Sequence, residues 1–555
     1  MPTVAQNIAR TLKAYGTEKF FCLCGGDHDL WYALDDEGIE IVNCRSEDAA
    51  VYMADGYARM TGKPGFVYGQ RGPGVANVAG SLADALWAKS PVISLTSSIA
   101  LTSRDRFEYQ ELDGLPLHQG VTKWNKTVSS PDRAAAMLRA AIRIALSPAP
   151  GPVHLEIPAD MFSLEAGDDV FCETEYLTVN SYRQPPDENL IEAIVRELAQ
   201  ARRPLIVAGK GVVISQAWNE LRALSDAMSI PVATSLGGKG AFDEALDLAV
   251  GVIGRNSRKI GNDAVRDCDV VLAVGTRLGG LATHRWSLPF QEKKLLHIDA
   301  DPMIIGQNYK TDVRVVADAK LALAKAHEVA LKKGYKCADP AWPSSMAQRI
   351  REWKGHAARL HIDQKVDAIH PAEVLSVLRK HMNADDVIGA DTGAHGGWVG
   401  ALFDVPAGKS MIRANGSLGW VFPGALGATL AGPKGRVVAV TGDGGMLYHI
   451  GEFETAMRLR IPTKVVVMNN ACLASEYHTQ KSHKRTVDSV LEFRDVDFAS
   501  VARSFGAWGR RVEASQDLDA AIAEALAYDG PALIDVKVSR EARSPSANRD
   551  KTRLV

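Results

Sequence analysis

The sequence predicts an α/β protein made of three doubly wound parallel-sheet domains in series. Short apolar segments alternate with helical segments along the chain, which is typical of parallel strands covered by helices on both faces. The 555 residues, of which 46% are hydrophobic, suffice for several domains with large cores. Two polar stretches that contain prolines, 180–187 and 332–365, divide this pattern into three blocks. These three observations lead to the predicted fold.

The first block is expected at residues 1–180, the second at 185–340 and the third at 365–538, and a basic tail follows at 539–555. The second block opens with a predicted helix and a strand of β-branched residues, which repeats the pattern of the first. The elements expected in the first two blocks are strands 19–24, 39–43, 65–68, 92–96, 153–157 and 204–208, and helices 46–60, 133–146 and 190–198.

The composition excludes several classes of partner. The 64 Lys and Arg residues are balanced by 66 Asp and Glu residues, so no basic face for nucleic acid is expected. No apolar run reaches the roughly 18 residues that a membrane span needs. The seven cysteines include one close pair and no second pair at zinc-binding spacing. We therefore expect a cytoplasmic globular protein with reduced thiols that acts on a small molecule.

The most informative segments follow two buried strands of the third block. Asp443 ends the first strand and is followed by Gly444 and Gly445, and Asn470 follows the second strand. Ligands of doubly wound sheets bind beyond the carboxyl ends of the strands, and a right-handed crossover brings both ends to one edge. A carboxylate, a carboxamide and a turn carbonyl suit Mg²⁺, and glycines let the backbone approach a phosphate. The pattern predicts a metal–diphosphate anchor.

The Gly-Asp-Gly and Asn-Asn segments together resemble the thiamine diphosphate motif. The resemblance covers nearly the whole chain and points to the thiamine diphosphate-dependent enzymes of the acetolactate synthase type, with features of 2-oxo acid decarboxylases, benzaldehyde lyase and 2-hydroxyacyl-CoA lyases. Gln70-Arg71-Gly72-Pro73-Gly74 stands where this family has a Ser-Gly-Pro-Gly turn. The other segments that carry the resemblance are 45–59, 109–111, 122–124, 151–160, 297–302 and 416–420.

The resemblance implies a role for each outer block. The N-terminal block would bind the aminopyrimidine of the cofactor, the middle block would be Rossmann-like, and the C-terminal block would bind the diphosphate and Mg²⁺. Asp443, Asn470 and the carbonyl of Cys472 would be the metal ligands. Glu47 would bind N1' of a cofactor shared with a partner subunit, so a homodimer is the minimum and a homotetramer is expected. The remaining cofactor-binding residues would be Thr392, His395, Gly416, Leu418, Gly442, Gly444, Gly445 and Leu473.

Four further residues are candidates for proton transfer near the reacting carbon. Glu476 lies where simple 2-oxo acid decarboxylases have a catalytic glutamate, although a surface position is the alternative. Either Asp27 or His28, in a loop that reaches the cofactor in relatives, would relay a proton, and the sequence leaves open which one. Gln110 would face the site from the partner side. Such groups suit reactions that protonate an enamine or deprotonate a hydroxyl.

The resemblance therefore implies an enzyme that forms a carbanion or enamine from a 2-oxo acid, an acyloin or a 2-hydroxyacyl thioester. The favoured reading is a lyase or decarboxylase with carboligase activity, and the alternative is an acetolactate synthase-type condensation of 2-oxo acids. The basic tail would bind an anionic group such as a coenzyme A phosphate, unless it is simply a solvated terminus. Its basic residues are Arg540, Arg543, Arg549, Lys551 and Arg553.

The middle block contains Gly209-Lys-Gly211 and Gly275-Thr-Arg277, which in relatives lie where FAD or another nucleotide binds. A lone Gly-x-Gly is a weak signal, and FAD is not favoured here. A flavin or nicotinamide oxidoreductase would leave Glu47 and the Gly-Asp-Gly and Asn-Asn segments unexplained. A non-catalytic, cofactor-binding regulatory subunit is expected to lack Glu47 or a metal ligand, and this chain has both.

Overall fold

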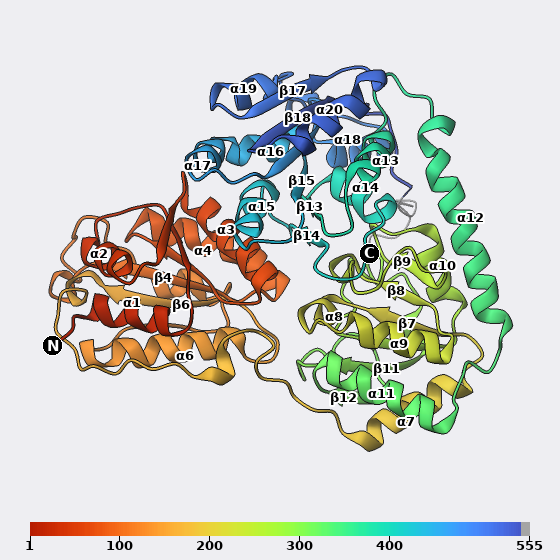
Figure 1. Ribbon diagram of the computed structural model, residues 1–555, viewed down its shortest axis with the longest axis horizontal. Coiled ribbons are helices and arrows are strands. Elements are labelled where there is room, and N and C mark those ends of the chain that lie inside the picture. Colours follow the sequence, from red (N-terminus) through yellow and green to blue (C-terminus); the bar gives the residue numbers. More distant parts are fainter. Residues whose placement is uncertain (546–555) are drawn as a thin grey trace. The chain divides into compact units, whose positions relative to one another are not determined.

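Residues 1–545 are described by the computed structural model, and they contain three six-stranded parallel sheets (Figure 1). The predicted fold class is thus confirmed. The chain divides into two compact units. The first contains Met1–Tyr182, Ala414–Pro433 and Tyr448–Thr463, and the second contains Arg183–Arg413, Lys434–Leu447 and the residues from Lys464 onward. Each unit is described by itself, and the block boundaries expected from the sequence remain a prediction.

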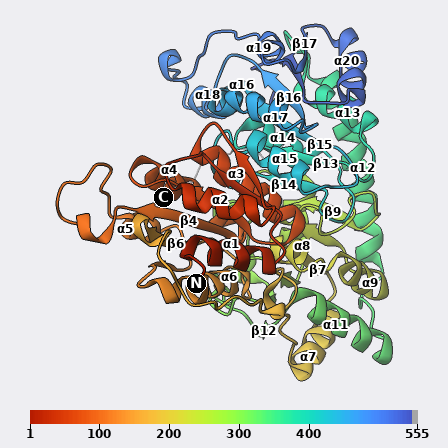
Figure 2. The same ribbon diagram turned by 60° about the vertical axis from the view of Figure 1, so that its left-hand side comes forward.

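The first sheet has the strand order β2-β1-β3-β4-β6-β5. Helices α1, α2 and α6 pack on one face through the apolar residues of a single core, and α3 and α4 lie on the other (Figure 1). Figure 2 shows α1 and α6 beneath strands β4 and β6. The elements are α1 (Val4–Ala14), β1 (Lys19–Cys22), α2 (His28–Asp36), β2 (Glu40–Asn43), α3 (Glu47–Thr61), β3 (Gly65–Gly69), α4 (Pro73–Ala88), β4 (Val92–Ser98), α5 (Gly114–Gln119), β5 (Asn125–Thr127), α6 (Ala134–Leu146) and β6 (Val153–Pro158).

The ends of α3 and α4 follow from local sequence. The Ser46 side chain accepts a hydrogen bond from the Ala49 N–H and so caps the start of α3, and Gly62 ends the helix with a φ of 77°. Pro73 occupies the first turn of α4, where its missing N–H has no helical partner to lose. These two helix starts lie beyond the carboxyl ends of β2 and β3, and the start of α3 carries Glu47.

The middle sheet has the order β12-β11-β10-β7-β8-β9, which is the dinucleotide-fold order 3-2-1-4-5-6 read from the other edge. Helices α7, α9 and α11 cover one face and α10 and α12 the other. The elements are α7 (Glu188–Gln200), β7 (Pro204–Ala208), α8 (Lys210–Ile214), α9 (Trp218–Met228), β8 (Val232–Thr234), β9 (Ala249–Val252), α10 (Lys259–Asp267), β10 (Val270–Val274), β11 (Lys294–Asp299), β12 (Val313–Val316), α11 (Ala319–Lys333) and α12 (Ala341–Asp363).

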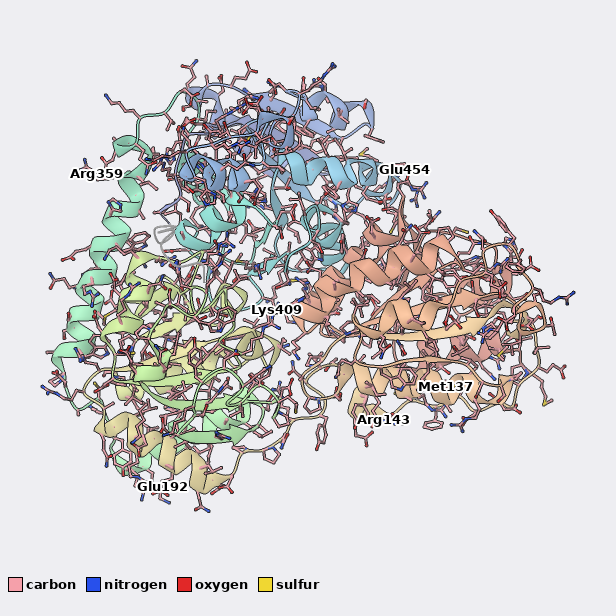
Figure 3. All side chains as sticks on the ribbon, turned by 180° about the vertical axis from the view of Figure 1, so that it is seen from behind. Met137, Arg143, Glu192, Arg359, Lys409 and Glu454 are labelled. Atoms are coloured by element: carbon pink, nitrogen blue, oxygen red, sulfur yellow. The ribbon has the colours of Figure 1, made fainter. Side chains whose placement is uncertain are left out.

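The polar stretch 332–365, expected to be a break between blocks, contains the whole of α12. Trp342, Met346 and Ile350 of this helix are buried in the core of the middle sheet. Its opposite side is polar, and Arg359 points outward there (Figure 3). A single apolar stripe at helical spacing is thus enough to anchor a segment whose overall composition is that of a linker.

The third sheet has the order β14-β13-β15-β16-β18-β17, which repeats the order of the first sheet strand for strand. Helices α13, α14 and α20 share one core with its strands. The elements are α13 (Pro371–His381), β13 (Val387–Ala390), α14 (Ala394–Leu402), β14 (Met411–Arg413), α15 (Val421–Leu430), β15 (Val437–Gly442), α16 (Asp443–His449), α17 (Phe453–Arg458), β16 (Lys464–Asn469), α18 (Ala474–Ser482), α19 (Phe498–Ser504), β17 (Trp508–Val512), α20 (Ser515–Ala527) and β18 (Ala532–Lys537). Among the described residues, no helix is both long and apolar enough to cross a membrane.

Candidate active site

Glu47 is the first residue of α3 and lies beside the first turn of α4. Its Oε2 accepts a hydrogen bond of 3.1 Å from the Nδ2 of Asn77. A Cβ built on Gly74 would lie 3.1 Å from its Oε1, so the glycine allows the carboxylate to sit close to the backbone of α4. Asn77 is a partner that the sequence analysis missed. Its place four residues after Pro73, a residue typical of a helix's first turn, was the available signal.

Asp27 occupies the loop between β1 and α2, and its side chain is directed into the protein. The hydroxyl of Tyr68 donates to Asp27 Oδ2, and Ser97 Oγ lies 2.9 Å from the same hydroxyl. Burial raises the pKa of Asp27, while Ser97 and the Arg71 guanidinium, with an Nη1 3.6 Å from Oδ1, lower it. His28 is exposed and its ring stacks near that of Tyr32. Of the two alternatives, Asp27 is therefore the residue that faces inward.

Gln110 lies in the loop after β4 and has a φ of 64°, a conformation that costs energy for a residue with a side chain. It packs on the turn after β3, where a Cβ built on Gly72 would lie 2.8 Å from the Cβ of Gln110. The first sheet thus brings Glu47, Asp27 and Gln110 to one edge, the carboxyl ends of its central strands.

The third sheet brings the predicted metal ligands together. Strands β15 and β16 are adjacent and parallel, so Asp443 and Asn470 follow neighbouring strand ends. Asp443 Oδ2 accepts from the N–H groups of Asn470 at 3.0 Å and Cys472 at 3.2 Å, and Oδ1 accepts from Gly444 at 2.7 Å. Burial raises the pKa of Asp443, and these backbone hydrogen bonds lower it. The carboxylate therefore fixes the loop that carries the other two expected ligands.

The residues around Asp443 fit a diphosphate. The Nε2 of His395, a buried side chain at the start of α14, has no hydrogen-bond partner among the described residues. A Cβ built on Gly442 would lie 3.1 Å from His395 Nδ1, so the imidazole lies directly against the end of β15. Burial lowers the pKa of His395 to about 4. An orphaned buried imidazole beside a metal-binding carboxylate is a place where an anion would be stabilised.

Glycine is required after Asp443 for a steric reason. A Cβ built on Gly445 would lie 2.5 Å from both Asp391 Oδ2 and Thr441 Oγ1, and one on Gly444 would crowd Leu473 and an aromatic ring. Thr392, another expected cofactor residue, follows Asp391 at the end of β13, and its N–H donates to that aspartate. The structure thus brings together the expected residues of the third sheet: Thr392, His395, Gly442, Asp443, Gly444, Gly445, Asn470, Cys472 and Leu473.

Two expected cofactor residues belong to the first unit. Gly416 has a φ of 147° and Leu418 is half-buried in the loop before α15. The first unit anchors this loop through Asp84, whose Oδ2 accepts from the N–H groups of Asn415 at 2.8 Å and Ser417 at 3.2 Å. Their role in bending the cofactor remains a prediction.

Glu476 lies in the first turn of α18 and is exposed. The segment is thus a helix, whereas a polar loop was the alternative weighed for it. Burial and the nearby Arg285 lower the pKa of Arg255, and the charge of Glu476 raises it. In the tail, Arg540 Nη1 donates to Glu492 at 2.6 Å, and its Nη2 lies 3.4 Å from the Asn470 carbonyl. Arg543 is described, whereas Arg549, Lys551 and Arg553 lie outside the described residues.

The glycines of the middle sheet have a packing role. A Cβ on Gly211 would lie 2.6 Å from the Cα of Gly275, so the two turns that follow β7 and β10 approach one another through their backbones. A Cβ on Gly209 would overlap the carbonyl oxygen of Gly275. These contacts explain all three glycines without a ligand, and the expectation about FAD remains a prediction.

Comparison with known proteins agrees with this architecture. Residues 2–117 match the family model "Thiamine pyrophosphate enzyme, N-terminal TPP binding domain", residues 191–326 match the central domain, and residues 391–536 match the C-terminal TPP binding domain. Three sheets in this order, with the Glu47 carboxylate at the edge of the first and the Asp443 carboxylate at the edge of the third, define an enzyme of the thiamine pyrophosphate-dependent class. The chain belongs to the thiamine pyrophosphate enzyme family, as the sequence resemblance predicted.

Two relatives are acetolactate synthases by name. The chain is 31% identical over 548 residues to a probable acetolactate synthase large subunit of Methanocaldococcus jannaschii, covering 96% of this chain and 91% of the relative. It is 32% identical over 539 residues to an acetolactate synthase large subunit of Parasynechococcus marenigrum, covering 95% and 86%. A sulfoacetaldehyde acetyltransferase of Castellaniella defragrans is 29% identical over 574 aligned positions, covering 98% and 94%.

Proposed function

We propose that the protein is a thiamine diphosphate- and Mg²⁺-dependent carboligase that decarboxylates a 2-oxo acid and joins the remaining acyl unit to a second carbonyl, as acetolactate synthases do. The observation that carries this proposal is the similarity to acetolactate synthases over nearly the full length of both chains. It reverses the preference drawn from the sequence, which favoured a lyase or decarboxylase and kept the synthase as the alternative.

The loop at the end of β15 and β16 would hold the cofactor's diphosphate. Asp443, Asn470 and the carbonyl of Cys472 would bind Mg²⁺, because hard oxygen ligands suit this ion and it shares its remaining positions with phosphate oxygens. His395 would donate from its unpaired Nε2 to a phosphate oxygen, since a nearby dianion favours the protonated imidazole. When bound, the cofactor would supply a carbanion source and an electron sink.

Glu47 would hold a proton at N1' of the aminopyrimidine. Asn77 Nδ2 donates a hydrogen bond to Glu47 Oε2, so Glu47 Oε1 would be the oxygen that contacts the cofactor. We further propose that Glu47 acts on a cofactor bound by a second copy of the chain, so that the active form is a homodimer or a larger even assembly.

A second candidate is a lyase or decarboxylase that protonates its product from Asp27. The specific observation is the burial of this carboxyl beside Tyr68 and Ser97, because burial raises its pKa toward the range of a general acid. Asp27 would donate a proton to the acyl carbon or take one from a substrate hydroxyl.

Product analysis distinguishes the two candidates. The protein is saturated with thiamine diphosphate and Mg²⁺ and supplied with pyruvate alone, with benzoin, or with a 2-hydroxyacyl-CoA. Acetolactate from pyruvate alone supports the synthase. Aldehyde from benzoin or the thioester, with pyruvate unchanged, contradicts the synthase and supports the lyase. Removal of Mg²⁺ with EDTA should abolish either activity, and activity that survives it would contradict the metal site.

A further inference from the structure

Arg71 is a cation at the edge of the first sheet that also carries Glu47, Asp27 and Gln110. It replaces the serine of the family's Ser-Gly-Pro-Gly turn. Its backbone N–H donates to Ser97 Oγ at 3.2 Å, which fixes the turn. Its guanidinium makes no hydrogen bond to the described residues and has one ion pair, at 3.6 Å to Asp27. The Arg71 side chain is 29% exposed and that of Asp27 is 4% exposed, so the free donors of Arg71 face outward.

The surroundings of Arg71 are those of the candidate active site. A Cβ built on Gly74, three residues further along, would meet Glu47 Oε1 at 3.1 Å and the Cβ of Gln70 at 3.6 Å. Gln110 packs on Gly72, the next residue in the chain. Arg71 therefore lies in the same turn that brings Glu47, Asp27 and Gln110 together.

The equivalent position in the third sheet carries Asp443, the proposed ligand of a metal ion. β3 and β15 occupy the same place in two sheets of identical strand order, and each is followed by a helix, α4 after a short turn and α16 directly. Beyond β15 stands Asp443, whose negative charge suits a cation. Beyond β3 stands Arg71, whose positive charge and five N–H donors suit an oxyanion.

We propose that Arg71 binds an oxyanion, such as a carboxylate or sulfonate, carried by the acceptor substrate, and so selects acidic over neutral carbonyl compounds. This inference rests on the proposed carboligase function. A planar guanidinium forms two parallel hydrogen bonds to a carboxylate, which its present 3.6 Å contact with Asp27 does not provide. The bound anion would also draw the positive charge away from Asp27, which favours the protonated form of that carboxyl.

The first test is binding without turnover. Malonate and ethanesulfonate are titrated calorimetrically into the protein saturated with thiamine diphosphate and Mg²⁺. We expect the wild type to bind both anions and Arg71→Ser to lose on the order of 10- to 100-fold in affinity, the usual worth of charged hydrogen bonds. Arg71→Lys should retain part of the affinity. Arg10→Ser is the matched control, because Arg10 has a similar single ion pair, at 3.7 Å to Glu37, outside the site.

The second test is acceptor preference. With pyruvate as donor, the ratio of kcat/KM for glyoxylate over acetaldehyde, and for sulfoacetaldehyde over acetaldehyde, should fall by a similar factor in Arg71→Ser and stay unchanged in Arg10→Ser. Equal malonate affinity in the wild type and Arg71→Ser, or no binding to the wild type at tens of millimolar, would overturn the proposal, as would an unchanged preference. If no acceptor reacts in any variant, the carboligase function fails and the titration alone decides the role of Arg71.

Discussion

The first and third sheets have the same strand order, yet their edges do different chemistry. At the end of its third strand the first sheet has Arg71 and the third sheet has Asp443. In each sheet a helix start completes the edge, with Glu47 on α3 in one and His395 on α14 in the other. The comparison shows that strand order decides where a ligand binds, because the carboxyl ends of the central strands meet at one edge of the sheet. A few residues that follow those strands decide which ligand is bound.

The two sheets also share a buried carboxylate at one register. Glu156 is the fourth residue of β6 and Asp535 the fourth of β18, and each strand pairs with the same two neighbours in its sheet. Burial raises the pKa of both carboxyl groups. In the third sheet this carboxylate holds the residue before Asn470, a proposed metal ligand, since Asp535 Oδ1 accepts from Asn469 Nδ2 at 2.9 Å. In the first sheet Thr127 donates to Glu156 at 3.0 Å.

The largest effect is expected at the edge of the third sheet. Asp443→Ala should weaken Mg²⁺-dependent binding of thiamine diphosphate by about 100-fold or more and abolish turnover, because it removes a metal ligand and the acceptor that holds the loop. Calorimetric titration of the cofactor measures this. The exposed Asp385, in the turn before β13, provides the control Asp385→Ala. Unchanged cofactor affinity in Asp443→Ala would contradict the proposed metal site.

Glu47→Ala should separate the role of the first sheet's edge in turnover from the role of the third sheet's edge in cofactor binding. Turnover is expected to fall by roughly 10²- to 10⁴-fold, the range for loss of an acid–base group, while the fold and cofactor affinity remain near those of the wild type. Steady-state kinetics and cofactor titration on the same preparation test both parts. The exposed Glu165 is a suitable control position. Near-normal rates in Glu47→Ala would remove the proton-transfer role from this residue.

A smaller effect is expected at Asn77. Asn77→Leu leaves Glu47 Oε2 without its donor, and residues that orient a functional group typically contribute 10- to 100-fold. We expect kcat to fall within this range, with a shift of the pH profile and unchanged thermal stability. Ala76→Leu alters an exposed neighbour on the same helix and should be neutral. A rise in KM with unchanged kcat would assign Asn77 to substrate binding instead.

The last expected effect concerns stability and leaves the proposed catalytic residues unchanged. Burial raises the pKa of Asp535 from 3.8 to about 6, whereas Asn469, Arg511 and the Phe498 N–H lower it. The folded state therefore holds its proton more tightly than the unfolded state, so this group lowers stability as pH rises from about 4 to 6. Roughly two units at about 1.36 kcal/mol each give on the order of 3 kcal/mol. Denaturant unfolding between pH 4 and 7 should show a flatter profile for Asp535→Asn, and an identical profile would show that the carboxyl ionises normally.

The sequence by itself determined the fold class of three parallel sheets, and it predicted a metal–diphosphate loop and the role of Glu47. The signal for the loop is local, since buried strands end beside Asp443 and Asn470, whereas Glu47 was implied by the family resemblance of segment 45–59. The sequence did not predict that α12 is a helix. Its apolar stripe of Trp342, Met346 and Ile350 is interspersed with polar residues and a proline, so the helical pattern is weak.

Only the tertiary structure showed that Asp27 is buried while His28 is exposed, and only it paired Asn77 with Glu47 and Arg71 with Asp27. Asp27 and Arg71 are far apart in the chain and meet because β1 and β3 are neighbours in the sheet. The physical reason is that a strand's sequence specifies its burial, whereas the partners of the residues beyond its end depend on which other strands end beside it.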